Sequence, residues 1–316
     1  MSDWHPGSGR APRIVTLLPA ATEIVCALGA RDALVGRSHE CDYPLGVEAL
    51  PACTLSRLNI HGSSIEIDRD VRQLLADSLS LYEVNPDTLR ALAPDVIVTQ
   101  AQCEVCAVSL DVVEAALATW TGRRPTIVSL APATLSDVWE SFRVVGQAIG
   151  AVPRAEALAA QAAERVEAIA ARTARTPPTR LACIEWLEPM MSAGNWMPEL
   201  IAAAGAQDVF EVAAGAHSPW IDADILAKSA PDIILAMPCG FALNQTAQEL
   251  NAWLARLQPL ALPAVRNGRV AMADGSQYFN RPGPRLIQSL EILCEVLGAP
   301  YGGEAKFEGD AWRWAT

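Results

Sequence analysis

The sequence predicts an α/β protein of two Rossmann-like lobes with mainly parallel sheets, bridged by one long helix. The helix is the first observation. Residues 153–174 are rich in Ala, Glu, Arg and Leu, which are strong helix formers, and contain no Gly. Pro153 suits the first helical position, and Pro177 prevents the helix from continuing further. At 1.5 Å per residue, the segment forms a rod of roughly 30 Å.

The second observation is an internal repeat. Residues 23–32 read EIVCALGARD and residues 199–208 read ELIAAAGAQD. Further along each half, residues 89–98 read LRALAPDVIV and residues 226–235 read LAKSAPDIIL. The order is the same in both halves, although the first half holds an insertion of about 39 residues between its two members. The repeat predicts two similar α/β lobes, one on each side of the rod.

In the first half, short apolar runs typical of buried strands alternate with longer runs of helical pattern. We expect strands at 13–18, 33–36, 95–99 and 126–130, and helices at 22–28, 65–79, 85–92, 108–120 and 135–149. Thr22 and Asn85 are predicted N-caps, and Gly29 is predicted to end the first helix. The polar residues 37–64 have the composition of a loop.

The second half continues the alternation. We expect strands at 180–186, 232–236 and 269–273, and helices at 196–204, 223–228, 246–257 and 284–297. The predicted organisation is a tail of residues 1–12, a lobe of 13–152, a bridging helix of 153–176, a lobe of 177–300 and a tail of 301–316.

Composition narrows the function. The 316 residues are 51% hydrophobic and 19% charged, with a formal charge of −12, so a nucleic-acid partner is not expected. No run approaches the roughly 18 apolar residues of a membrane span. Residues 1–12 do not resemble a signal peptide, which predicts a cytoplasmic protein, or a periplasmic one if a leader was trimmed. In the cytoplasm, the eight Cys are expected to be reduced thiols or metal ligands.

Ligands of open α/β sheets bind outside the carboxyl ends of the strands, and two facing lobes would place these loops along one cleft. The predicted ligand-binding residues on these loops are Glu40, Tyr43, Gln100, Trp196, Trp220, Tyr278, Phe279 and Arg281. Aromatic rings there can stack on a flat ligand, and Arg281 can hold an anionic group. The alternatives are core packing for the aromatics and an ion pair for Arg281.

The Cys residues suggest a metal site. Cys103 and Cys106 have the CxxC spacing with which two thiolates share one ion, zinc or iron–sulfur. The residues that can complete such a site are His39, Cys41, Cys53 and Cys239. The alternative is that these thiols are small buried apolar groups, as is expected of Cys26, Cys183 and Cys294 within predicted helices and strands.

Enzyme signatures are missing from the sequence. It contains no GxxxxGK[ST], no GxSxG, no HExxH and no GxGxxG after a strand. This favours binding over catalysis.

Several of these segments resemble a known family. RIVTLLPAATEIVCALGARDALVGRSHECDYP (13–44), the two repeated segments and YFNRPGPRLI (278–287) are similar to class III substrate-binding proteins of ABC importers, the vitamin B12- and iron-siderophore-binding group. The resemblance covers roughly residues 12–300. It implies two lobes bridged by one helix, little hinge motion, and a metal chelate in the cleft. The first expected ligand is a corrinoid such as cobalamin, and the second is an iron-siderophore or haem-like chelate. It also implies an ABC permease as partner if the protein is exported.

The resemblance also assigns roles to single residues. It places permease-docking acids at Asp87 and Asp224. It places aromatic residues of the cleft at Trp220 and Tyr278. Glu40 and Gln100 stand where the B12-binding relatives are expected to carry aromatics. The Cys-bearing loops SHECDYP, QCEVC and MPCGF also look like a leaderless branch labelled cobalamin-binding. The alternative function is therefore a cytosolic zinc or iron–sulfur protein, or a thiol-dependent enzyme, on the same fold.

Overall fold

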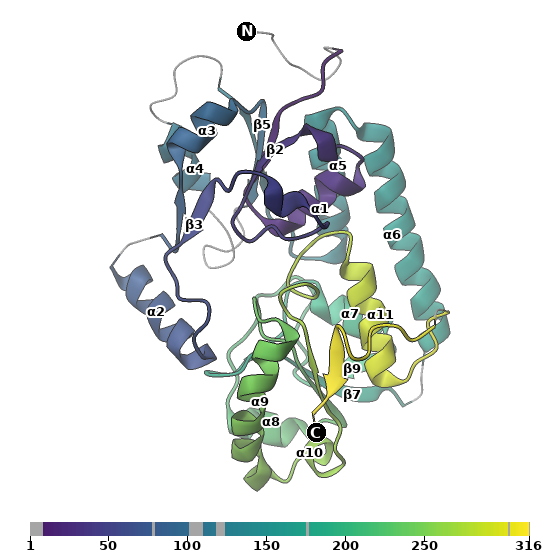
Figure 1. Ribbon diagram of the computed structural model, residues 1–316. Helices are drawn as coiled ribbons and strands as arrows, with labels where there is room; N and C mark the ends of the chain where they lie inside the picture. The colour runs from purple at the N-terminus through teal and green to yellow at the C-terminus, as the bar shows by residue number, and fades with distance from the viewer. Residues whose placement is uncertain are drawn as a thin grey trace. The chain divides into compact units, whose positions relative to one another are not determined.

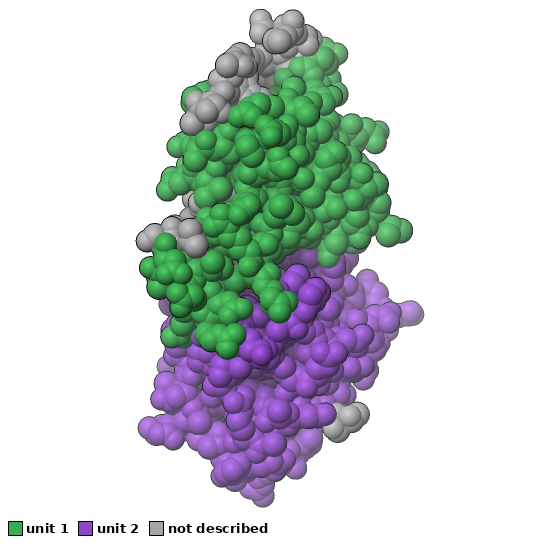
Figure 2. Space-filling view, turned by 60° about the vertical axis from the view of Figure 1, so that its left-hand side comes forward, with its two compact units in different colours: residues 1–59, 69–132, 136–162 green, residues 60–68, 133–135, 163–316 purple. Residues whose placement is uncertain are grey.

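The computed structural model describes residues 9–77, 80–100, 110–117, 124–174, 177–302 and 304–315. The chain forms two compact units (Figure 2). Unit 1 comprises residues 1–59, 69–132 and 136–162, and unit 2 comprises residues 60–68, 133–135 and 163–316. Each unit is built on a mainly parallel sheet with helices around it, so the predicted fold class is confirmed.

Unit 1 contains a four-stranded parallel sheet in the order β2-β1-β5-β6 (Figure 1). The strands are β1 (Ile14–Thr16), β2 (Leu34–Arg37), β5 (Val96–Gln100) and β6 (Thr126–Leu130). The helices of this half of the chain are α1 (Pro19–Ala27), α2 (Ser64–Ala76), α3 (Pro86–Leu92), α4 (Leu110–Leu117) and α5 (Leu135–Ile149). A separate antiparallel pair, β3 (Thr54–Ser56) and β4 (Tyr82–Val84), lies within the insertion.

Unit 2 contains the second sheet, in the order β12-β11-β10-β7-β8, with β9 also paired to β7. The strands are β7 (Thr179–Trp186), β8 (Met191–Ser192), β9 (Ala206–Asp208), β10 (Ile233–Ala236), β11 (Val270–Ala273) and β12 (Trp312–Trp314). The helices are α7 (Met197–Ala203), α8 (Ala223–Ser229), α9 (Leu243–Leu257), α10 (Pro263–Arg266) and α11 (Leu286–Leu297). The pairs β7·β9, β7·β10 and β10·β11 are parallel, as are the pairs of the four-stranded sheet in unit 1.

The repeat in the sequence is also a repeat in topology. In unit 1 the first strand lies between the second and the third (β2-β1-β5), and in unit 2 β7 lies between β9 and β10 in the same way. Both repeated segments contain the sequence Ala-Pro-Asp, at residues 93–95 and 230–232, and these match in backbone conformation. Ala93 ends α3 with φ +43° and Ala230 ends α8 with φ +41°, both left-handed. The chain therefore stops each helix and enters the next strand by the same turn.

The predicted rod is α6 (Val152–Thr173), which runs beside α5 in Figure 1. Its buried positions lie on one face: Ala155, Ala159, Ala162, Ile169 and Thr173. Small residues bring the two helices close, because a Cβ on Gly146 of α5 would lie 2.3 Å from the Cβ of Ala155. At the other end, the Thr173 hydroxyl donates to the carbonyl of Ala203 at 2.6 Å. The division between the two units falls inside this helix.

Two local predictions need correction. Helix α1 begins at Pro19 rather than Thr22, because Pro takes the first position and no side chain caps the helix. The predicted loop 37–64 contains β3 and the first residue of α2. By contrast, Asn85 caps α3 as predicted, its carboxamide oxygen accepting from the N–H groups of Asp87 and Thr88. Among the described residues, no helix is long and apolar enough to cross a membrane.

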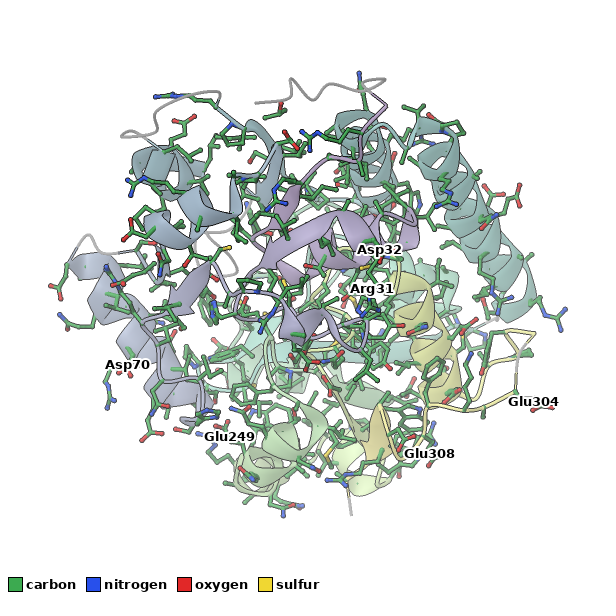
Figure 3. The ribbon with its side chains drawn as sticks, turned by 45° about the horizontal axis from the view of Figure 1, so that its top comes forward. Arg31, Asp32, Asp70, Glu249, Glu304 and Glu308 are labelled. Atoms are coloured by element: carbon green, nitrogen blue, oxygen red, sulfur yellow. The ribbon has the colours of Figure 1, made fainter. Side chains whose placement is uncertain are left out.

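Residues 60–68 belong to unit 2 through contacts with α9. Glu249, labelled in Figure 3, accepts from both the N–H and the hydroxyl of Ser64, the latter at 2.7 Å. One turn earlier on α9, the Gln245 carboxamide donates to the carbonyl of Ile60 at 3.0 Å. The start of α2 is therefore fixed to α9 by two side chains on one helix face.

Candidate functional site

The first candidate loop comes after β2, at the carboxyl end of the unit 1 sheet. Two guanidinium groups hold its backbone. Arg37 donates to the carbonyls of Ser38 (2.8 Å) and Glu48 (2.9 Å), and Arg31, labelled in Figure 3, donates to that of Leu45 (2.7 Å). Because these contacts reach backbone oxygens along residues 38–48, they fix the shape of the loop.

Buried polar side chains gather at this end of the sheet: Thr16, Thr22, Ser38, Thr54, Thr99 and Gln100. The Thr22 hydroxyl lies 2.7 Å from that of Thr16 and donates to the thiol of Cys41 at 2.9 Å. Thr22 lies inside α1, three residues after Pro19, so its hydroxyl is not at the N-cap position. Hydroxyl groups buried at the carboxyl ends of parallel strands are where an α/β sheet presents polar groups to a ligand.

His39 lies in the turn directly after β2. Its Nδ1 is 2.7 Å from the Thr54 hydroxyl, and its ring centroid is 5.6 Å from that of Tyr82. Burial lowers the pKa of His39, and the neighbouring Arg37 lowers it further, so the imidazole is neutral at pH 7. The partners Thr54 and Tyr82 are the first residues of β3 and β4, two strands that the sequence pattern does not predict.

In unit 2, the loops after β10 and β11 are joined backbone to backbone. A Cβ on Gly275 would lie 2.1 Å from the carbonyl oxygen of Pro238, so only Gly allows this approach. The N–H of Ser276 donates to the Phe241 carbonyl at 3.0 Å, and the Asn280 carboxamide donates to the Met237 carbonyl at 3.3 Å. Sequence reasoning missed Asn280, although it lies in the YFNRPGPR segment next to Arg281.

The end of β7 joins the same edge. The N–H of Cys239 donates to the Glu185 carbonyl at 3.0 Å, and the Ser218 hydroxyl donates to the Glu185 carboxylate at 2.9 Å. The rings of Trp186 and Phe241 pack edge to face, with centroids 5.3 Å apart. Three loops, after β7, β10 and β11, therefore converge at the carboxyl end of the unit 2 sheet.

The predicted ligand-binding residues divide by exposure. Trp196, Phe279 and Arg281 are buried, and the Trp196 indole donates to the Phe279 carbonyl at 2.8 Å. These three shape the loop after β11 from within. Trp220 is 55% exposed and Tyr43 is 41% exposed, so both rings are open to solvent over part of their surface.

The remaining three predicted ligand-binding residues are less exposed than Trp220 and Tyr43. Glu40 and Tyr278 are half-buried, whereas Gln100 ends β5 with only 5% of its surface exposed. The Tyr278 ring lies 5.5 Å from the guanidinium of Arg285 and packs edge to face with Phe307. The ligand-binding role of all eight residues stays a prediction.

The predicted metal ligands are not gathered into one cluster in the described residues, where no three His, Cys, Asp or Glu side chains are placed to share an ion. Cys41 and Cys53 are buried, and Cys239 is half-buried. Burial raises the pKa of Cys53 to about 11, which keeps it a thiol. Cys103 and Cys106 lie outside the described residues. A zinc or iron–sulfur site that includes them stays a prediction.

The predicted docking acids occupy equivalent places. Asp87 lies in the first turn of α3 and Asp224 in the first turn of α8, and both are exposed. Asp87 pairs with Arg90 at 2.6 Å. Both carboxylates lie near helix N-termini, where the helix dipole favours them.

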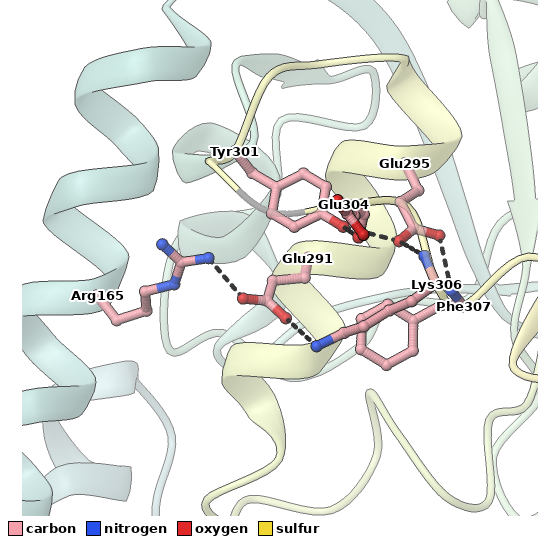
Figure 4. Close-up of polar contacts among 7 residues, drawn as sticks. All are labelled: Arg165, Glu291, Glu295, Tyr301, Glu304, Lys306 and Phe307. Atoms are coloured by element: carbon pink, nitrogen blue, oxygen red, sulfur yellow. Dashed lines mark hydrogen bonds and ion pairs between the residues drawn. The ribbon is translucent and has the colours of Figure 1, made fainter.

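The C-terminal segment is anchored on α11 (Figure 4). The Glu295 carboxylate accepts from the Tyr301 hydroxyl (2.9 Å), the backbone N–H groups of Lys306 (2.8 Å) and Phe307 (3.2 Å), and the Trp312 indole (2.9 Å). A cavity of about 360 Å³ lies between this segment and the end of α11. None of the predicted ligand-binding residues lines it, so it is not the site expected from the sequence.

Comparison with known families identifies the fold. The model of a family described as periplasmic binding protein matches residues 14–276, which is most of the chain. The chain belongs to this family. Its members are binding proteins rather than enzymes, in agreement with the missing catalytic motifs. Among curated proteins, no sequence matches the chain.

Solved structures of other binding proteins have the same fold. The haem-binding protein HutB of Vibrio cholerae is 17% identical, with a TM-score of 0.68 over 90% of this chain and 98% of its own. The haem-binding protein RhuT from Roseiflexus sp. RS-1 is 21% identical, with a TM-score of 0.67 over 91% of this chain and 98% of its own. The vitamin B12-binding protein BtuF of Vibrio cholerae is 20% identical, with a TM-score of 0.62 over 91% of this chain and 97% of its own. The predicted class III fold is thereby confirmed.

Proposed function

We propose that this binding protein holds a metal chelate at the carboxyl ends of its sheets, a corrinoid first and a haem or ferric siderophore second. Membership of the family supports the binding of a solute. The structural neighbours are described as binding haem or vitamin B12, which are large planar chelates. A planar chelate suits a site where aromatic rings are exposed and loops are fixed.

The observation that carries the proposal is the convergence of the loops after β7, β10 and β11. Gly275 fits against Pro238 without a side chain, and Asn280 donates to Met237, so these loops need little ordering when a ligand binds. The exposed ring of Trp220 suits stacking on a flat ligand. A rigid, preformed site is the usual form of a small-molecule site.

Delivery to an ABC permease is the second part of the proposal. Asp87 and Asp224 begin equivalent helices in the two units and are exposed, as a docking acid on each unit requires. Docking to a permease from outside the cell requires export of the protein. Cell fractionation with an antibody against the protein tests the location, and co-purification with a permease tests the partner.

The first experiment is the absorption spectrum and metal content of the protein as isolated, followed by calorimetric titration with cobalamins, haemin and ferric siderophores. Saturable binding of one of them supports the proposal. Absence of a binding signal with all three classes of chelate overturns it. The zinc, iron–sulfur or thiol alternative is tested by the same elemental analysis on anaerobically purified protein. Metal that is present without a chelate and lost in Cys103→Ser favours that alternative.

A further inference from the structure

The hydrogen bonds around His39 determine which of its ring nitrogens carries the proton. The Thr54 hydroxyl donates to Ser38 Oγ at 3.2 Å, and the same Ser38 oxygen also accepts from the N–H of Glu40. Thr54 Oγ1 has therefore used its only proton. It then acts as an acceptor for both close nitrogens of His39, the backbone N–H at 3.0 Å and Nδ1 at 2.7 Å.

It follows that Nδ1 of His39 is protonated and Nε2 carries a lone pair. The Nε2 atom is shielded from solvent and has no hydrogen-bond partner among the described residues. A buried polar atom without a partner is rare in a folded protein and destabilises it. The sum of these features is an imidazole fixed through Nδ1–H to an oxygen, with Nε2 unused, which is the arrangement of a metal-ligating histidine.

We propose that Nε2 of His39 is the protein's axial ligand to the metal of the bound chelate. This rests on the proposed function and goes beyond it, because it selects chelates with an open axial position, such as haem and corrinoids, over ferric siderophores whose donors surround the iron. The turn that holds His39 comes directly after β2, at the carboxyl end of the sheet.

The surroundings of His39 favour ligation. Thr54 supplies the second contact that orients the ring. Nε2 is shielded from solvent, so ligation requires local side-chain movement of the kind common at binding sites.

The most direct test uses cob(II)inamide, a corrinoid without a nucleotide base of its own. Its electron paramagnetic resonance spectrum, bound to wild-type protein, is expected to show a three-line nitrogen splitting that becomes two-line when the protein contains ¹⁵N-histidine. The splitting should persist in His217→Ala, since His217 is an exposed histidine of unit 2. It should vanish in His39→Ala. A wild-type spectrum without nitrogen splitting overturns the proposal without any variant.

Affinity gives a second test. His39→Ala should weaken binding of haemin by about tenfold or more, because a ligand to the metal is lost. Binding of metal-free protoporphyrin IX should change by less than about twofold, since that ring has no metal to ligate. Equal losses for both porphyrins would show a structural effect and overturn the proposal. If chelates bind without nitrogen ligation, only this inference fails; if none binds, the proposed function fails with it.

Discussion

Asp232 in unit 2 makes the same two hydrogen bonds to a strand backbone as Asp95 does in unit 1. The Asp95 carboxylate accepts the backbone N–H of Arg13 at 2.8 Å, and the Asp232 carboxylate accepts that of Arg180 at 3.0 Å. Each Asp also donates its own N–H to the carbonyl of the same Arg, at 2.8 and 2.9 Å. The Ala-Pro-Asp segments of the repeat thus join β1 to β5 in unit 1 and β7 to β10 in unit 2, at the amino ends of these strands.

We predict that Asp232→Ala lowers the free energy of unfolding by about 1 kcal/mol, since one backbone N–H loses its acceptor. Asp232→Asn, which keeps an acceptor oxygen, should lie close to wild type. Urea unfolding followed by circular dichroism measures both. Equal effects of Ala and Asn would show that the carboxyl oxygen does not act as described.

Gly275 is predicted to tolerate no side chain. Gly275→Ala should cost about 2–3 kcal/mol, because the new methyl group meets backbone oxygens of Met237 and Pro238 that cannot move alone. It should also weaken ligand binding by shifting the loop after β11. The matched control is Gly240→Ala, which has open space and only the strain of its φ of +77°, about 1 kcal/mol. Urea unfolding and a binding titration of both variants check this, and a Gly275→Ala protein as stable as Gly240→Ala would contradict it.

Glu295 is predicted to hold the C-terminal segment in place. Glu295→Gln should destabilise the protein by about 3 kcal/mol, because its NH₂ group replaces one carboxylate oxygen and faces the two donors from which that oxygen accepts. Glu304→Gln is the control, since Glu304 is exposed and contributes only its backbone carbonyl to Tyr301. Thermal unfolding of Glu295→Gln and Glu304→Gln compares their stabilities. Equal stability of the two variants would contradict the prediction.

The thiols are predicted to differ in reactivity. The pKa of Cys53 is raised to about 11, so at pH 8 roughly one molecule in a thousand carries the reactive thiolate. Cys239 is half-buried and should be alkylated before Cys53. Peptide mapping after brief exposure to iodoacetamide gives the order. Labelling of Cys53 should rise as the pH approaches 11, and equal rates at pH 8 would contradict the prediction.

Much of the fold could be predicted because local signals agreed with the tertiary structure. Asn85 and Pro86 predicted the start of α3, and Gly29, with φ +73°, ended α1 as expected. The start of the rod was predicted to within one residue. The strand pair β3·β4 was missed, because strands of three residues that pair across an inserted helix carry no periodic signal of their own.

The site was harder to predict than the fold. The sequence located the loops, since these come after apolar strands, but it could not show which side chains point inwards. Trp196 and Phe279 are aromatic and lie on the right loops, yet both are buried and linked to each other. The role of Thr54 depends on a contact with His39 across 15 residues, which only the folded chain creates.

The central claim is that the protein binds a metal chelate, and calorimetric titration tests it most directly. Folded protein is titrated with aquocobalamin, haemin and a panel of ferric siderophores, with metal-free protoporphyrin IX as the control for nonspecific binding of a flat ring. We expect saturable one-to-one binding of at least one chelate, with a shift in its visible spectrum. Absence of heat and of any spectral change with every chelate would contradict it.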